Sequence, residues 1–190
     1  MQWRRGFLGC FLFGATALAL VGCHHEGGGV PGPTPSSSGF PGLTTSTSVT
    51  LNGGGGSVPL SSTGLSATLQ YASSNGAGAG GTFTLTTVAP ALPGAPSGNP
   101  IVFGELVLTS NVNFSSYFWV STVTIPTSLL TLTSSNQVFE TVYDQTASAQ
   151  IGNAVTGTIS GQTVTFPSIG SGIGFTANAN DTYLFVVSYQ

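Results

Sequence analysis

Four consecutive residues near the N-terminus carry the side chains that most often bind zinc: Cys23, His24, His25 and Glu26. Thiolate, imidazole and carboxylate groups are the ligands of protein zinc sites. The stretch therefore raises the hypothesis of a metal site. Whether the cysteine can act as a thiolate ligand depends on the segment that precedes it.

That segment has the organisation of an export signal. Arg4 and Arg5 give it a basic start, Gly6–Ala19 is almost entirely apolar, and small residues stand just before Cys23. A basic start, an apolar core and a small-residue cleavage site are typical of a signal peptide. We therefore predict a signal peptide over residues 1–22. The alternative is a retained transmembrane helix, which needs about 20 apolar residues.

The residues at the end of this signal resemble a known family. Leu20-Val21-Gly22-Cys23 resembles the lipobox of bacterial lipoproteins. The resemblance implies cleavage between Gly22 and Cys23 and attachment of acyl chains to Cys23. Two or three such chains give durable membrane anchoring, because each buried CH₂ contributes about 0.8 kcal/mol. The thioether sulfur would then be no metal ligand, so we expect no metal site and no cofactor.

The same resemblance bears on localisation and export. In Gram-negative lipoproteins an Asp after the cysteine favours the inner membrane, so His24 implies the outer membrane, on its periplasmic face or at the cell surface. Arg4-Arg5-Gly6-Phe7-Leu8 also resembles a twin-arginine motif. Trp3 and Gly9 depart from that motif, and a basic start is expected of ordinary Sec signals too. Sec export is favoured, and both routes stay open.

The mature chain is almost uncharged. After Arg5 there is no Lys or Arg, and five acids follow: Glu26, Glu105, Glu140, Asp144 and Asp181. Proteins that bind nucleic acid use Lys and Arg to displace counterions from phosphates, so we predict no nucleic-acid partner. No cysteine follows Cys23, so no disulfide is expected.

Composition divides the mature chain into a tether and a domain. Residues 23–46 are rich in Gly, Pro and Ser, which is typical of a flexible linker. Over residues 47–190, short runs rich in Val, Thr, Phe and Tyr alternate with Gly, Ser, Asn and Pro, which predicts strands. The expected strands are Ser48–Leu51, Leu65–Tyr71, Thr82–Val88, Ile101–Thr109, Tyr117–Ile125, Leu129–Thr133, Gln137–Asp144, Ala154–Ile159, Gln162–Phe166, Ile173–Ala177 and Thr182–Tyr189.

Strands at this spacing predict an all-β fold with a single antiparallel β-sandwich, and a barrel is the alternative. The Pro-rich loop Ala89–Pro100 could divide two units, but one domain is the simpler interpretation. Asp181-Thr182-Tyr183-x-Phe185-x-Val187 resembles the last strand of many immunoglobulin-like modules. An immunoglobulin-like or related sandwich is therefore expected.

Catalysis would have to rely on carboxylates, because the domain contains no His, Cys, Lys or Arg. Glu140 and Asp144 share one face of a strand about 13 Å apart, whereas glycosidase pairs lie about 5–10 Å apart. Glu105 or Asp181 could approach either one. We predict solvated acids and no enzyme activity, with an acid hydrolase as an alternative. Solvated acids also predict a melting temperature that stays nearly constant from about pH 4 to 8.

Two further stretches could bind ligands. In Tyr117-Phe118-Trp119, strand alternation places Tyr117 and Trp119 on one face, where they could stack on sugars if exposed or fill the core if buried. The oxygen-rich run 178–181 could hold calcium, but it lacks regular acidic spacing and favours a turn.

The sequence thus predicts a lipid-anchored envelope protein that presents a non-catalytic β-sandwich for surface structure, adhesion or interaction with a glycan or protein partner. Carbohydrate binding through Tyr117 and Trp119 is the first alternative. Without Lys on its edge strands, the domain must protect them with Pro, Gly or assembly.

Overall fold

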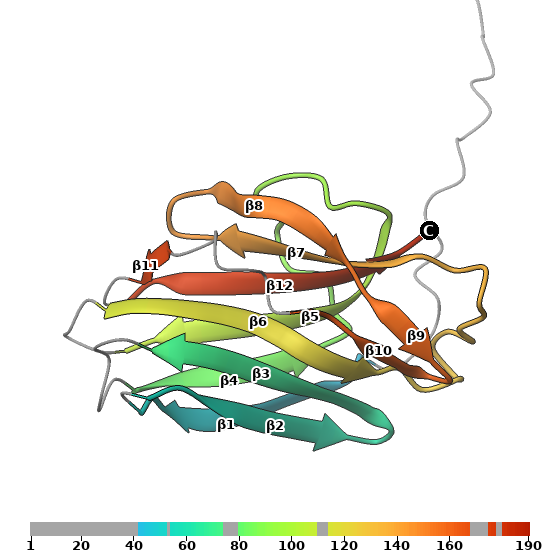
Figure 1. Cartoon of the computed structure of the whole chain (residues 1–190), viewed down its shortest axis with the longest axis horizontal. Coiled ribbons are helices and arrows are strands. Elements are labelled where there is room, and N and C mark those ends of the chain that lie inside the picture. Colours follow the sequence, from blue (N-terminus) through green and yellow to red (C-terminus); the bar gives the residue numbers. More distant parts are fainter. Residues whose placement is uncertain (1–41, 53, 74–79, 110–113, 168–174, 178–179) are drawn as a thin grey trace, which may run out of the picture. The chain divides into compact units, whose positions relative to one another are not determined.

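The structure is a computed structural model that describes residues 42–52, 54–73, 80–109, 114–167, 175–177 and 180–190. Its strands form two antiparallel sheets that pack face to face, which confirms the predicted β-sandwich (Figure 1). The strands are β1 (Thr44–Thr50), β2 (Gly56–Ser62), β3 (Leu65–Ser73), β4 (Gly80–Thr86), β5 (Asn99–Leu108), β6 (Phe114–Thr124), β7 (Val138–Asp144), β8 (Ala149–Thr156), β9 (Thr158–Ser160), β10 (Thr163–Thr165), β11 (Phe175–Ala177) and β12 (Thr182–Tyr189).

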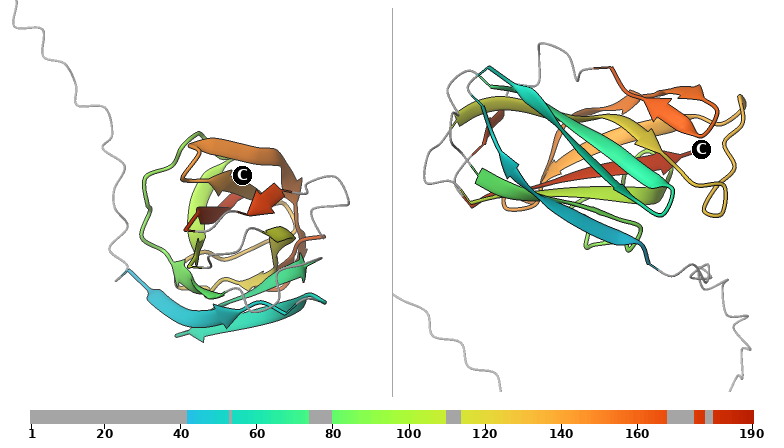
Figure 2. Two further views of the ribbon diagram at one scale, coloured as in Figure 1. Left: turned by 90° about the vertical axis from the view of Figure 1, so that its left-hand side faces the viewer. Right: turned by 90° about the horizontal axis from the view of Figure 1, so that it is seen from below.

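We name the two sheets by their strand order. Sheet A runs β1-β4-β5-β12-β7-β8, and sheet B runs β2-β3-β6-β10-β9 with β11 beside β6. Figure 2 shows the sandwich from one end and from below. In the described part of the chain, no helix is long and apolar enough to cross a membrane.

Alternation of side chains along the strands places apolar residues on the inner faces of the sheets, where the sheets pack against each other. In β4, Phe83 and Leu85 are buried, while the threonines between them point the other way. Each fully buried Phe or Leu stabilises the fold by roughly 1.5–3 kcal/mol relative to an exposed one. β12 is buried on both faces, as its continuous apolar run suggests.

The outer face of β12 is covered by the segment between β4 and β5. We call this segment, residues 87–98, the strap. Its Leu92 packs against an apolar cluster on the outer face of sheet A: Phe103, Tyr143, Leu184 and Val186. The Oγ of Ser188 donates a hydrogen bond to the carbonyl of Ser97. The Pro-rich loop therefore packs onto the sandwich and does not separate two units.

The strands expected from the sequence differ from the structure in several places. Gly56–Ser62 forms β2, which was not expected; its Pro59 is tolerated because β2 lies at the end of sheet B, where one side needs no backbone donor. The expected strand Ala154–Ile159 is divided between β8 and β9. Leu129–Thr133 was expected to be a strand and is a turn followed by irregular chain. In addition, β1 begins at Thr44, inside the stretch expected to be linker.

The side chain of Gln162 explains why the segment after Pro126 can leave the sheet. Its Nε2 donates to the carbonyls of Ile125 (2.9 Å) and Leu130 (2.7 Å), and its Oε1 accepts the N–H of Leu132 (3.0 Å). One amide thus satisfies backbone groups that a neighbouring strand would otherwise bond.

Candidate functional site

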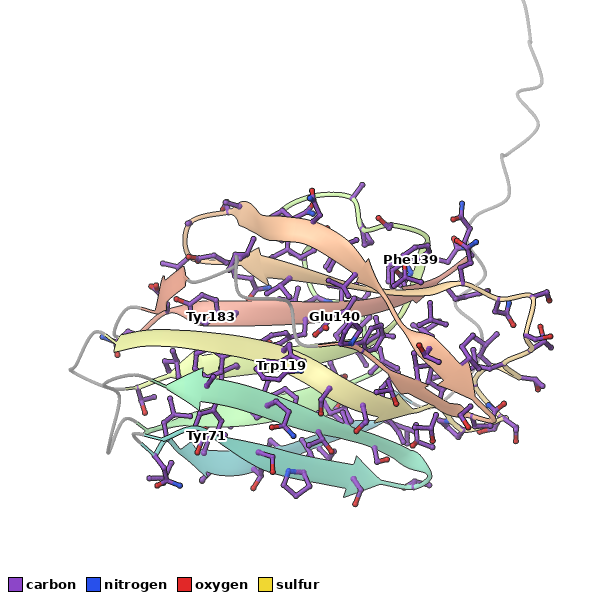
Figure 3. All side chains as sticks on the ribbon, in the orientation of Figure 1. Tyr71, Trp119, Phe139, Glu140 and Tyr183 are labelled. Atoms are coloured by element: carbon purple, nitrogen blue, oxygen red, sulfur yellow. The ribbon has the colours of Figure 1, made fainter. Side chains whose placement is uncertain are left out.

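Glu140 is the most unusual titratable residue of the described chain. It lies on β7 between Val138 and Val142, on the face of sheet A that meets sheet B (Figure 3). Its exposed fraction is 0%. Oε1 accepts a hydrogen bond of 2.7 Å from the N–H of Val120 in β6, whereas Oε2 has no hydrogen-bond partner. The carboxyl group therefore joins the two sheets through the core.

The path of β6 leaves the Val120 N–H available to this carboxyl. The β3–β6 register shifts beside Val120, so Ser121 has no partner on β3. On the other side of β6, β11 pairs with Phe114–Ser116 and β10 with Thr122–Thr124. Between these segments, the N–H of Phe166 donates to the carbonyl of Ser121 (2.9 Å), and none of the described strands pairs with residues 117–120 on that side. Glu140 thus supplies an acceptor where a neighbouring strand is missing.

Burial changes the titration of Glu140. Burial raises the pKa of the Glu140 carboxyl from 4.5 to about 8, and the hydrogen bond from Val120 lowers it only in part. The described residues include no Lys or Arg that could offset the desolvation. At pH 7 the group is therefore mostly the neutral acid, the form that a core tolerates best.

This finding corrects the expectation that the acids are solvated, since Glu140 is buried. It also predicts a pH-dependent melting temperature in place of the nearly constant one expected from the sequence. The pKa of Glu140 is higher in the folded chain than in the unfolded chain. Its contribution to stability is therefore complete below about pH 4.5 and is lost as the pH rises through about 8.

The other acids of the domain lie apart from Glu140. Glu105 is on β5, where it shares the outer face of sheet A with Phe103. Asp144 ends β7, and its Oδ1 accepts the N–H of Ala147 (2.8 Å) in the turn to β8. Because Glu105 and Glu140 project from opposite faces of sheet A, these two do not form the carboxylate pair that a glycosidase requires.

Asp181 has a structural role at the start of β12. Its carbonyl accepts the N–H of Leu108 (2.9 Å), and its Oδ2 accepts the hydroxyl of Tyr183 (3.2 Å). Asn180 before it has a φ of 64°, a left-handed conformation that Asn tolerates in turns. These contacts favour the turn interpretation over calcium binding, and residues 178 and 179 lie outside the described part. No group of three or more His, Cys, Asp or Glu that could hold a metal occurs among the described residues.

The outer face of β7 carries a second set of buried polar groups. Thr141 and Tyr143 are buried on the strap side of sheet A, and neither side-chain hydroxyl has a hydrogen-bond partner. Desolvation raises the pKa of Tyr143 above its usual value of 10.0. The strap approaches this ring closely, since a Cβ built on Gly94 would lie 3.4 Å from Cε1 of Tyr143. No sequence pattern could have predicted these buried hydroxyls, because Thr and Tyr are common on either face of a strand.

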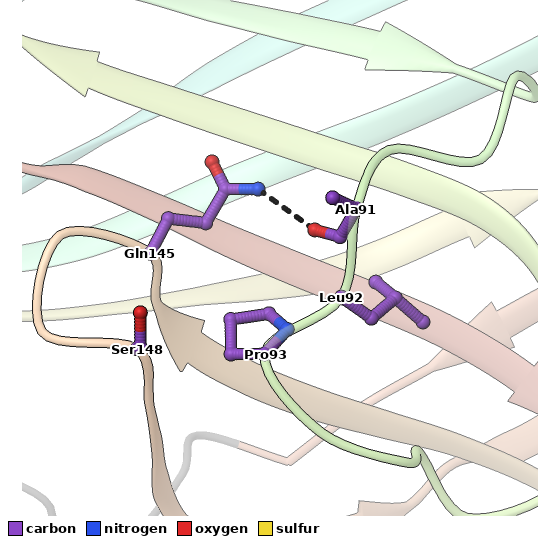
Figure 4. Close-up of a pocket in the computed structure, with 5 residues that line it drawn as sticks. All are labelled: Ala91, Leu92, Pro93, Gln145 and Ser148. Atoms are coloured by element: carbon purple, nitrogen blue, oxygen red, sulfur yellow. Dashed lines mark hydrogen bonds between the residues drawn. The ribbon is translucent and has the colours of Figure 1, made fainter.

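A shallow pocket of about 390 Å³ opens beside the strap. It is lined by Ala91, Leu92, Pro93, Gln145 and Ser148, which come from the strap and from the β7–β8 turn (Figure 4). The Nε2 of Gln145 donates to the carbonyl of Ala91 (3.3 Å). The lining includes the hydroxyl of Ser148 but no titratable side chain that could activate it as a nucleophile.

The aromatic stretch in β6 is only partly described. Phe118 is buried in the core, with its ring centroid 6.2 Å from that of Tyr71 and 6.3 Å from that of Tyr183. Trp119 is half-buried and packs against the core cluster, and the side chain of Tyr117 lies outside the described residues. A sugar-stacking pair formed by Tyr117 and Trp119 therefore stays a prediction.

The N-terminal residues singled out in the sequence, Gly22, Cys23, His24, His25 and Glu26, also lie outside the described part. The chain matches no protein-family model, and comparisons with curated proteins and with solved structures give no significant match.

Proposed function

We propose that this chain is a lipid-anchored protein of the bacterial cell envelope, and that it presents its β-sandwich as a non-catalytic module for surface structure, adhesion or interaction. The proposed anchor is Cys23, on the basis of the lipobox-like Leu20-Val21-Gly22-Cys23 after an apolar segment. The proposed location is the outer membrane.

One observation supports the non-catalytic role most strongly. A buried carboxyl with a raised pKa is a common signature of a catalytic acid. Glu140 has this property, but it is fully buried in the core, and neither Glu105 nor Asp144 shares its surroundings. A general acid must come within about 3 Å of the group that it protonates. An acid that no substrate can reach is better explained as part of the interface between the sheets.

The binding alternative has less support. Stacking on a sugar requires an exposed aromatic face, and Trp119 packs partly against the core. We therefore keep carbohydrate binding through Tyr117 and Trp119 as the second candidate and do not prefer it. An interaction module without Lys or Arg would bind its partner mainly through hydroxyl, amide and apolar groups.

Metabolic labelling with an alkyne fatty acid in a Gram-negative host tests the anchor. Wild type should incorporate the label, and Cys23→Ser should lose it and leave the membrane fraction. Cys10→Ser is the matched control, because Cys10 lies inside the signal and should not affect labelling. Label retained in Cys23→Ser, or absent from wild type, would contradict the proposal.

A further inference from the structure

Apart from the three-residue β11, which pairs with β6 alone, four of the described strands lie at sheet ends: β1 and β8 in sheet A, and β2 and β9 in sheet B. A strand at the end of a sheet exposes a row of unpaired N–H and C=O groups that can pair with another chain. Proteins usually block such edges with Pro, charge, bulges or very short strands. The four edge strands differ in whether they carry such a blocking feature.

Three of the four edges carry a blocking feature. β2 contains Pro59, which has no N–H to donate. β9 is only three residues long. β8 is irregular, because its register with β7 shifts between Glu140 and Val142 and its Gly152 has a φ of 64°.

β1 carries none of these features. Its seven residues, Thr44–Thr50, include no Pro, Gly or charged residue. It pairs with β4 in one continuous register from Thr44 opposite Thr86 to Thr50 opposite Gly80. β1 is thus a regular, uncharged edge made mostly of Thr, a residue that favours strands.

The hydrogen bonds identify which backbone groups of β1 are available. The carbonyl of Leu43 accepts the N–H of Thr87 (2.9 Å), so residue 43 bonds toward β4. In an antiparallel ladder the bonded residues alternate. Thr45 and Thr47 therefore bond to β4, while Thr44, Ser46, Ser48 and Thr50 direct their backbone groups to the edge. Of these groups, the carbonyl of Thr50 already accepts the Tyr71 hydroxyl (3.4 Å). These four residues are exposed.

We propose that a second copy of this chain pairs its own β1 with this edge, antiparallel and around a two-fold axis at Thr47. In this register Ser46 meets Ser48 of the second copy, and Thr44 meets Thr50. Each of these pairs joins two residues whose backbone groups face the edge, so N–H groups meet C=O groups at Ser46 and Ser48. At the ends of the strand, the carbonyl of Thr50 would be shared with the Tyr71 hydroxyl.

A second copy fits this edge better than a charged or nucleic-acid partner. β1 carries no charge, so two copies do not repel each other and a charged partner would gain no ion pair. The two-fold pairing uses the same edge on both copies and therefore closes at a dimer. In sheet B the edge strand β2 lies on the same side of the sandwich, and its Pro59 interrupts any matching ladder there (Figure 2). The inference does not depend on the lipid anchor.

Disulfide cross-linking in the full chain tests this register. In the proposed dimer the two copies of Thr47 face each other as a non-hydrogen-bonded pair, about 4.5 Å apart between Cα atoms, within disulfide range. Thr47→Cys should therefore form a covalent dimer under mild oxidation on a non-reducing gel. Thr45→Cys is the matched control on the same face, because its two copies would lie about 13 Å apart.

A second variant removes the edge donor without disturbing β4. In Ser46→Pro, residue 46 has no N–H to direct to the edge. Because both copies carry the substitution, the dimer loses this donor twice. It should reduce the cross-linked fraction of Thr47→Cys by about tenfold. Its melting temperature, measured alongside, should show that the domain still folds.

The cross-linking results either support or overturn the pairing of two β1 strands. A dimer of Thr47→Cys that is absent from Thr45→Cys and reduced by Ser46→Pro supports the proposal. Equal cross-linking at both positions, no cross-linking at Thr47→Cys, or no effect of a folded Ser46→Pro overturns it. Wild type, which carries only Cys10 and Cys23, is run beside the variants, and only cross-linking above the wild-type level is counted as cross-linking at position 45 or 47.

Discussion

The two faces of β7 bury polar groups to the same extent but with different consequences. On the inner face, Glu140 is sealed between the sheets with one oxygen bonded and one unbonded. On the outer face, Thr141 and Tyr143 lie beside the strap with unbonded hydroxyls. A carboxyl group can ionise near neutral pH, whereas these hydroxyls do not. The carboxyl on the inner face therefore makes the free energy of unfolding depend on pH near neutrality. The hydroxyls on the outer face change this free energy by an amount that does not depend on pH in the same range.

The largest effect should come from removing the carboxyl that joins the sheets. Glu140→Ala leaves a cavity and an unbonded Val120 N–H, and should cost about 2–4 kcal/mol of unfolding free energy near pH 5. Glu140→Gln keeps an acceptor for Val120 and should cost about 1 kcal/mol or less. Urea denaturation of the full chain measures both. Equal stability of Glu140→Ala and wild type would show that the carboxyl does not hold the sheets together.

A smaller effect is expected where the strap covers the outer face. Leu92→Ala removes a half-buried side chain from the apolar cluster on sheet A and should cost about 1–2 kcal/mol. Val88 lies on the same strap but is 56% exposed. Val88→Ala should therefore change the free energy of unfolding by less than about 0.5 kcal/mol. Equal losses in the two variants would mean that the strap is not anchored through Leu92.

The smallest effect should come from the unbonded hydroxyl of Tyr143. Tyr143→Phe removes a buried group without a partner, so stability should stay the same or rise by up to about 1 kcal/mol. Tyr71→Phe is the matched comparison, because the Tyr71 hydroxyl accepts the N–H of Asn52 (3.2 Å) and donates to the carbonyl of Thr50 (3.4 Å). That variant should lose about 1 kcal/mol in urea denaturation. A loss at Tyr143 as large as at Tyr71 would indicate that the Tyr143 hydroxyl is bonded.

The sequence predicted the sandwich because strand alternation is a local property. Thr82–Thr86 alternates polar and apolar residues, and Thr182–Val187 is continuously apolar, and both form strands. β2 was missed because a Pro within a strand is tolerated only at a sheet edge, and a single sequence does not reveal which strands are edges. Leu129–Thr133 has the composition of a strand, but Gln162, about 30 residues later, provides its hydrogen bonds.

The position of Glu140 could have been inferred only in part. Glu140 alternates with Val138 and Val142, which places it on an apolar face of its strand. Phe139 and Tyr143 make the opposite face apolar as well, so local pattern does not decide which face meets the second sheet. The bond to Val120 depends on the register shift in β6, which is a property of the assembled sheets.

The central claim is that Glu140 is a neutral acid sealed in the core and not a solvated or catalytic group. Thermal melting of the full chain from about pH 5 to about pH 9 tests it most directly, with Glu140→Gln as the comparison. Because the folded-state pKa is raised to about 8, the melting temperature of wild type should fall as the pH rises. That of Glu140→Gln should stay nearly constant. Equally flat curves, or the same fall in both proteins, would contradict the account.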